Sequence, residues 1–113
     1  MTDIRAELNN LPLSAQKVRL VIDLIRGRDA NEVLEMLRFV NKRAALPVSK
    51  LVASAVANAE ENFGVSRDDL YIANIFANEA PTRKWRRFGA RGRFKPILRR
   101  TSHVTVILRE RGA

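Results

Sequence analysis

The residues best suited to chemistry lie in one stretch, RKWRRFGARGRFK, from Arg83 to Lys95. It holds seven cationic side chains, three aromatic rings and two glycines, and it has no acidic residue. Guanidinium groups bind phosphates and stack on flat rings, aromatic side chains stack on bases, and glycine allows close approach to the backbone. The stretch therefore favours a nucleic-acid partner, and RNA over DNA because an irregular arm suits an irregular partner.

An acidic protein and a membrane surface are the alternative partners for this stretch. Membrane-surface binding usually uses a helix with one apolar face, and Gly89, Gly92 and Pro96 disfavour a helix here. The chain also has no apolar run of 18 or more residues, and its first residues lack the pattern of a secretory signal. We therefore expect no membrane partner.

The positive charge is concentrated in one part of the chain. The 113 residues carry 21 Lys and Arg against 12 Asp and Glu, a net charge of +9. Ten of the basic residues and none of the acids fall between Ala80 and Arg109, so the remainder has a net charge of −1. A segment this basic on an otherwise balanced body indicates a polyanionic partner.

Catalytic chemistry is poorly supported by the residue types. The one histidine, His103, lies in a strand-like stretch, where a hydrogen-bonded structural role is expected. Adjacent carboxylates at Asp68 and Asp69 would point in different directions, so they indicate a turn rather than an acid–base pair. Cysteine is absent, which fits a reducing compartment, and no metal-ligand spacing occurs. We expect no enzymatic activity, no metal, no cofactor and no small-molecule substrate.

Two stretches near the N-terminus have the apolar spacing of helices. The first is expected to begin after an N-cap at Ser14 and to stop at Gly27. The second follows Asp29 and Glu32, which resemble a capping pair, and is expected to run to about Phe39.

A third, alanine-rich helix is expected to end before Gly64. Its start is open, because Asn41 would serve as a cap whereas Pro47 prefers the first turn of a helix that begins near Leu46.

Beyond these helices the pattern changes to that of strands. The stretches LYIANIFA, from Leu70, and HVTVIL, from His103, are rich in β-branched and aromatic residues. The segment from Met1 to Leu11 fits a helix or an edge strand. If the two later strands pair, Arg83 to Lys95 is the far end of a long hairpin, and some twelve residues per arm would reach roughly 40 Å. We also expect the glycines of GARG to allow a turn at its tip rather than to form a KH-type loop.

The expected fold is α+β: three helices packed on a small antiparallel sheet with a long projecting β-hairpin. The 113 residues are expected to form a single domain, with the basic hairpin spanning about residues 78–102.

Smaller basic groups occur at the ends of the expected helices. They are Lys17 and Arg19 at the first helix, Lys42 and Arg43 between the second and third, and Lys50 further on. Each alone is expected to be an ordinary exposed charge, but together they would form a second phosphate-contacting face.

Six motifs occur in a fixed order between Ser14 and Arg109: SAQKVRLVIDLIRG, NKRAA, SAVANAEEN, DDLYIANIFANEAP, GARGRF and RRTSHVTVIL. In this combination the chain resembles the bacterial-type family of large-subunit ribosomal protein twenty-two, almost without gaps. The resemblance implies a body on the subunit surface and a hairpin threaded through large-subunit ribosomal RNA. It also implies a role in subunit assembly and a hairpin tip that lines the nascent-peptide exit tunnel.

The same resemblance implies which residues contact RNA and which face the tunnel. RNA contact is expected at Ser14, Lys17, Arg19, Lys42, Arg43, Lys50, Arg83, Lys84, Arg86, Arg87, Arg91, Arg93, Lys95, Arg99 and Arg100. The tunnel-facing tip is expected at Arg87, Phe88, Gly89, Ala90 and Arg91.

The chain departs from the family pattern near the expected tip. Glu79-Ala80-Pro81 replaces a typical EGP, Trp85 replaces a basic residue, and Phe88-Gly89-Ala90 replaces PRA. Nascent-chain behaviour and macrolide binding are therefore not carried over from the family.

The residues and the resemblance together predict a structural, RNA-binding constituent of the large ribosomal subunit in the cytoplasm. Its expected partners are large-subunit ribosomal RNA, neighbouring ribosomal proteins and the nascent peptide. The alternative is a free-standing RNA-binding or RNA-chaperone protein that uses the same arm transiently.

Overall fold

The body is built on a three-stranded antiparallel sheet. The computed structural model describes residues 3–80, 83–88 and 94–111. The sheet order is β1 (Ile4–Leu11), β5 (Ser102–Glu110), β2 (Leu70–Glu79), so β5 pairs with a strand on each side. The helices of the body are α1 (Ala15–Ile22), α2 (Ala30–Leu37) and α3 (Ala45–Phe63), with a short 3₁₀ turn, η1 (Arg67–Asp69), before β2.

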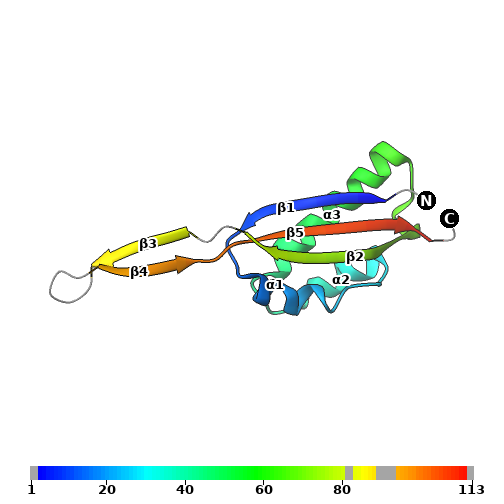
Figure 1. The fold of residues 1–113 in the computed structure, drawn as a ribbon. Helices are drawn as coiled ribbons and strands as arrows, with labels where there is room; N and C mark the ends of the chain where they lie inside the picture. The colour runs from blue at the N-terminus through cyan, green and yellow to red at the C-terminus, as the bar shows by residue number, and fades with distance from the viewer. Residues whose placement is uncertain (1–2, 81–82, 89–93, 112–113) are drawn as a thin grey trace.

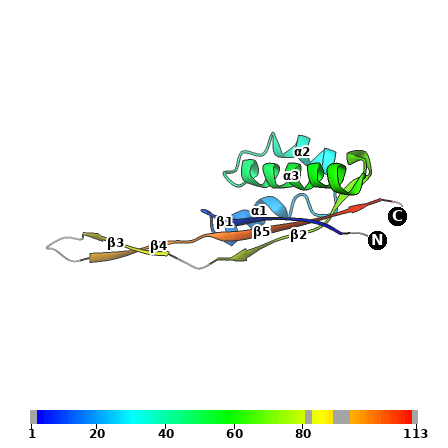
Figure 2. The same cartoon turned by 90° about the horizontal axis from the view of Figure 1, so that it is seen from above.

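The helices cover one side of the sheet. Figure 2 shows α2 and α3 above one face, and Figure 1 shows α1 along the edge formed by β2. Strand β5 turns Val104, Val106 and Leu108 into the core, where all three are fully buried. They pack against the helices, whose own buried residues recur at helical spacing and so form one apolar face on each helix. The α+β class predicted from the sequence is confirmed.

The first helix is shorter than predicted. Ser14 is its N-cap, as expected, but α1 ends at Ile22 and the chain continues in turns to Gly27. Gly27 has φ of 83°, a left-handed conformation that suits glycine, and its N–H donates to the carbonyl oxygen of Ile72 at 2.9 Å. Pairing with the sheet therefore ends the helix one turn before the apolar spacing stops.

The structure also gives the helix boundaries and the type of the first segment, which the sequence left open. Helix α2 begins after Asp29 and ends at Leu37, two residues before the predicted end. Helix α3 begins at Ala45, so Pro47 lies in its first turn and Asn41 is not its cap. The first segment is an edge strand rather than a helix, with Ile4 paired to Leu108 of β5.

The arm is a two-stranded extension of the body. Strands β2 and β5 pair antiparallel, and a hydrogen bond from Ala80 N to Thr101 O (3.0 Å) continues their pairing toward the arm. Beyond it β3 (Arg83–Phe88) pairs with β4 (Phe94–Arg99), with Phe88 opposite Phe94.

These two strands project from one end of the body (Figure 1). The protein extends 65 × 26 × 18 Å, and its radius of gyration is 17.2 Å, against about 13 Å for a compact chain of this length. The tip residues Gly89, Ala90 and Arg91, and Arg93, lie outside the described residues. The single-domain assignment and the limits of the hairpin remain predictions.

Candidate nucleic-acid interface

The outer edge of β2 is closed by groups from α1 and the turn after it. Arg19 donates from Nε and Nη2 to the carbonyl oxygen of Ala77, at 3.2 and 2.8 Å. Arg26 Nη2 donates to the carbonyl oxygen of Ile75 at 2.7 Å. These guanidinium groups satisfy carbonyl groups that an edge strand would otherwise leave open. Nothing in the sequence indicated this role for either arginine.

The cationic side chains of the body fall into two groups. Eight arginines bind an acidic side chain or a backbone carbonyl of the protein itself: Arg5, Arg19, Arg26, Arg28, Arg38, Arg67, Arg109 and Arg111. Five cations make no side-chain hydrogen bond or ion pair with any other described residue: Lys17, Lys42, Arg43, Lys50 and Arg100. All five are exposed. Each belongs to the set predicted to contact RNA, and these cations are therefore available to an external anion.

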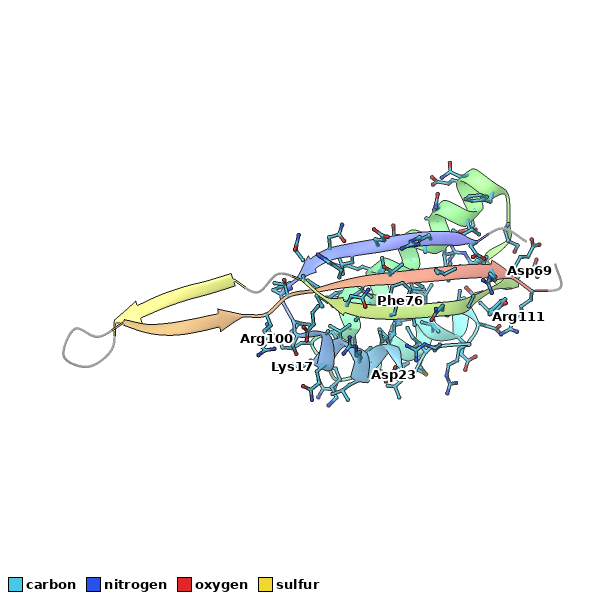
Figure 3. The ribbon with its side chains drawn as sticks, viewed as in Figure 1. Lys17, Asp23, Asp69, Phe76, Arg100 and Arg111 are labelled. Atoms are coloured by element: carbon cyan, nitrogen blue, oxygen red, sulfur yellow. The ribbon has the colours of Figure 1, made fainter. Side chains whose placement is uncertain are left out.

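The five free cations gather toward one end of the body. Lys17 and Arg100 lie beside the base of the arm, whereas Asp69 lies at the opposite end (Figure 3). Helix α3 begins on the arm side (Figure 2), with Lys42 and Arg43 just before it. Acidic residues lie toward its other end, at Glu60 and Glu61. The body is thus polarised along its length, with its available positive charge next to the basic arm.

The base of the arm brings distant predicted residues together. A polar hollow of about 250 Å³ is lined by Ser14, Ala15, Gln16, Glu79, Ala80, Arg100 and Thr101. Ser14 and Arg100 are 86 positions apart in the sequence, yet both line it. Ser14 also has a structural role, because its Oγ accepts a hydrogen bond from Lys17 N at 3.4 Å.

The register of the arm places like charges opposite one another. Arg83 is paired with Arg99, and Arg87 with Lys95. Directly opposed like charges destabilise a strand pair unless counter-charges lie near them. With eight cationic and no acidic residues between Arg83 and Arg99, the arm has no counter-charge of its own. A polyanionic partner would supply one.

Lys84 and Arg86, two further residues predicted to contact RNA, lie on β3 of the arm.

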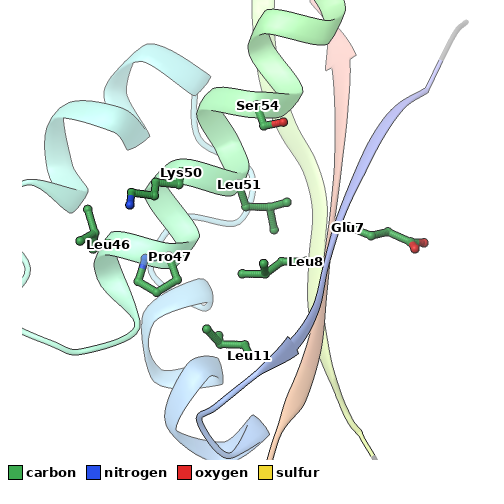
Figure 4. A pocket seen from close by; sticks show the side chains of 8 residues that line it. All are labelled: Glu7, Leu8, Leu11, Leu46, Pro47, Lys50, Leu51 and Ser54. Carbon is green, nitrogen blue, oxygen red and sulfur yellow. The ribbon is translucent and has the colours of Figure 1, made fainter.

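Another hollow of the described body is lined mainly by apolar side chains. It has a volume of about 390 Å³ and lies between β1 and α3 (Figure 4). Leu8 and Leu11 point into it, while Glu7 points away and Lys50 lies on its rim. Such a lining brings no pair of acid–base groups together.

The residues considered for catalysis have structural partners. His103 Nδ1 accepts a hydrogen bond from Asn10 N at 3.1 Å, which ties β1 to β5. Asp68 accepts one from Asn31 Nδ2 at 2.7 Å, and both Asp68 and Asp69 belong to the turn η1. Among the described residues there is no cluster of three or more His, Cys, Asp or Glu that would hold a metal ion. None of the helices described is long and apolar enough to cross a membrane.

Two exposed ion pairs shift the pKa values of their members. A hydrogen bond from Arg67, opposed by a smaller desolvation effect, lowers the pKa of the Glu60 carboxyl. A hydrogen bond from Arg109 likewise lowers the pKa of Asp3. The first pair joins the last turns of α3 to η1, and the second joins the beginning of the chain to β5. Both pairs are structural rather than catalytic.

Comparison with known proteins decides which family the chain belongs to. The family model for ribosomal protein L22p/L17e matches residues 6–109. The large ribosomal subunit protein uL22 of Pediococcus pentosaceus is 44% identical over 111 residues, which cover 98% of this chain and 94% of that protein.

The chain belongs to the ribosomal protein L22p/L17e family.

Members of this family are structural proteins of the ribosome, so the expectation of a non-enzymatic protein is confirmed. The match covers the elements of the body as well as the arm. The L22p/L17e assignment is also consistent with an anionic partner for the five free cations, because a ribosome is rich in RNA phosphate. Which of the predicted residues touch RNA remains a proposal.

Proposed function

We propose that this chain is a structural constituent of the large ribosomal subunit that binds large-subunit ribosomal RNA and supports assembly of the subunit. It would work in the cytoplasm as part of the ribosome, with neighbouring ribosomal proteins as further partners. Family membership and the name of the Pediococcus relative support the assignment to the large subunit. The observation that best supports RNA binding is the distribution of the cations. The five that have no partner among the described residues lie toward the arm, whereas the eight arginines listed above bind groups of the protein itself.

The mechanism we infer is phosphate neutralisation on two surfaces. The arm would fill space between RNA segments that otherwise repel each other, and RNA phosphates would relieve the repulsion between opposed residues such as Arg83 and Arg99. The arm-side end of the body would contact further phosphates through Lys17, Lys42 and Arg43. A protein that binds several RNA segments in this way favours their assembly into one particle.

The tunnel role is a finer part of the same proposal. The resemblance of GARGRF and its neighbours to the family supports a tip at Arg87 to Arg91 that faces the nascent peptide. Trp85, Phe88 and Gly89 depart from the family pattern at or near the tip. We therefore propose that the tip lies beside the nascent peptide, and we make no proposal about how it affects that peptide.

Sedimentation of a cell lysate through a gradient tests the proposed function. We expect stable, nearly stoichiometric co-migration with large subunits at high salt. Release into the soluble fraction at modest salt would instead indicate the free RNA-binding or RNA-chaperone protein. In isolation, RNA affinity should fall on the order of 10³-fold between 50 and 200 mM salt if six or more phosphates are neutralised.

A further inference from the structure

Phe39 has the most exposed side chain among the large hydrophobic residues of the described chain, at 83%. It follows α2, and its position is fixed by the backbone, because Phe39 N donates to Met36 O at 3.1 Å and Val40 N donates to Leu37 O at 3.4 Å. Burying a phenylalanine side chain stabilises a protein, and the body does not gain this stabilisation from Phe39. The sequence signal is slight, since Phe39 falls off the apolar face that Val33 and Leu37 share.

The stretch of sequence that follows Phe39 is basic. Between Glu35 and Glu60 the chain carries Arg38, Lys42, Arg43 and Lys50 and no acidic residue. Arg38 is paired with Glu35, at 3.4 Å. The other three are among the free cations described above, and Lys42 and Arg43 follow Phe39 within four residues. An exposed ring beside unpaired cations is the combination with which proteins bind single-stranded RNA, by stacking on a base and neutralising its phosphates.

Phe63 provides an internal comparison. It is 47% exposed at the last position of α3, but its neighbours are Glu60 and Glu61. Phe63 is the last residue of α3, whereas Phe39 precedes the first residue of that helix, Ala45, by six positions, and α3 is about 27 Å long by the rise of 1.5 Å per residue. Phosphate would be attracted at the Phe39 end and repelled at the Phe63 end.

We propose that Phe39 stacks on an unpaired base of RNA, with Lys42 and Arg43 on the adjoining phosphates. This inference rests on the proposed function and extends it, because it adds an aromatic contact on the body to the phosphate contacts. It also assigns the partner at this end of α3 to single-stranded rather than helical RNA, in which bases are already stacked and their faces closed to a side chain.

Equilibrium binding of the whole protein to a single-stranded oligonucleotide containing 2-aminopurine tests the stacking. Phe39→Ala should weaken binding about 5-fold or more, since stacking on an aromatic side chain is worth about 1–3 kcal/mol per base. Phe39→Trp should keep the affinity. Phe63→Ala, which removes the same side chain from the acidic end, should leave it unchanged. Because Phe39 is 83% exposed, the alanine variant should unfold at the Tm of the parent protein.

Salt dependence separates stacking from phosphate contact. Phe39→Ala should leave the slope of log affinity against log salt unchanged, whereas Lys42→Gln and Arg43→Gln should each reduce its magnitude by about 0.7 for a single strand. Since the arm also binds RNA, we would then irradiate assembled large subunits with ultraviolet light. Mass spectrometry should find a nucleotide attached to Phe39.

The outcomes are distinguishable. If the parent protein binds RNA and enters the subunit, but Phe39→Ala binds as the parent does and no nucleotide attaches to Phe39, the stacking contact is wrong while the proposed function stands. A cross-link from Phe39 to another protein would likewise overturn it in favour of a protein contact. If the parent protein neither binds RNA nor enters the subunit, the proposed function itself fails.

Discussion

Arg19 and Ala77, 58 residues apart in sequence, are joined by two hydrogen bonds from one guanidinium group to one carbonyl oxygen. Beside this contact, Arg26 binds the carbonyl of Ile75, and the backbone of Gly27 and Arg28 pairs with Ile72. The outer edge of β2 is therefore covered along much of its length. An arginine that its place on the first helix and the family resemblance assign to RNA thus stabilises the sheet from which the arm extends.

We expect Arg19→Ala to lower the free energy of unfolding by about 1 kcal/mol, because the carbonyl of Ala77 loses two hydrogen bonds from a charged guanidinium. Arg19→Lys should lower it by a similar amount although it keeps the charge, since an ammonium group cannot donate in the bidentate geometry of a guanidinium. Denaturant unfolding measures both changes.

Lys17→Ala is the matched control, two residues away on the same helix. Its side chain makes no hydrogen bond or ion pair with another described residue, so we expect unchanged stability and weaker RNA binding. If Lys17→Ala destabilised the protein as much as Arg19→Ala, the distinction between free and engaged cations would be wrong.

The free and engaged cations should differ in their effect on RNA binding. Replacing Lys17, Lys42 or Lys50 with glutamine should each reduce the magnitude of the salt slope by about 0.7–0.9, the value for one neutralised phosphate. Replacing Arg5 or Arg38 removes the same charge from an existing ion pair and should change the slope less. Filter binding to large-subunit RNA at several salt concentrations measures the slopes. Equal slopes for both classes would contradict the proposed interface.

Replacing residues 83–99 with a short glycine-containing turn should separate the body from the arm. The core residues among the described side chains come from the body, so we expect the body to fold with a cooperative transition. Association with precursor ribosomal RNA should weaken by at least tenfold, because eight cationic residues are removed. Gradient sedimentation of cells that carry the variant measures this. An unaffected association would remove the role assigned to the arm.

The Glu60–Arg67 pair should make stability depend on pH in the acid range. Because the pKa of Glu60 is lower in the folded protein than in the unfolded chain, the pair stabilises the fold above the unfolded value, about 4.3. That contribution is lost as the pH falls through the lowered folded value. Glu60→Gln should therefore have a lower Tm than the parent protein at pH 7 and the same Tm in strong acid. Glu61→Gln, which lacks an ion pair, should match the parent at both, and a Tm difference for Glu60→Gln that persisted in strong acid would contradict this account.

Asn10 holds a left-handed conformation, with φ of 58°. Asn10→Ala should cost about 1 kcal/mol, because a side chain with Cβ is strained there and alanine has no polar group to compensate. Asn10→Gly should be nearly neutral and should keep the hydrogen bond from residue 10 N to His103 Nδ1. Thermal unfolding of the two variants distinguishes backbone strain from loss of the side chain.

The fold class could be predicted because most helices and strands are indicated by residues within or beside them. Ser14 caps a helix, Gly64 ends one, and the strand pattern around Val104 alternates as a half-buried strand should. The exceptions depend on distant contacts. The stretch Ile4–Leu11 fitted a helix or a strand until its pairing with β5, about 100 residues away, decided it. The end of α1 was wrong because Gly27 bonds to Ile72, which local spacing does not contain.

The exposure of basic residues at the helix ends was predictable from the sequence, but their partners within the protein were not. Basic residues at helix ends could be found from the sequence, and Lys17, Lys42 and Arg43 are indeed unpaired in the described structure. Arg19, two residues from Lys17 on the same helix, binds Ala77 instead. The difference arises from the position of β2, which only the folded chain brings beside α1.

The central position of β5 determines when the sheet can form during translation. Strands β1 and β2 both pair with β5, which is translated after every other described element. Between synthesis of Ile4 and that of its partner Leu108, a ribosome working at about 5–20 residues per second needs roughly 5–20 s. The cationic arm is therefore synthesised before the strand that closes the sheet, and the body can complete its sheet only once β5 has been made.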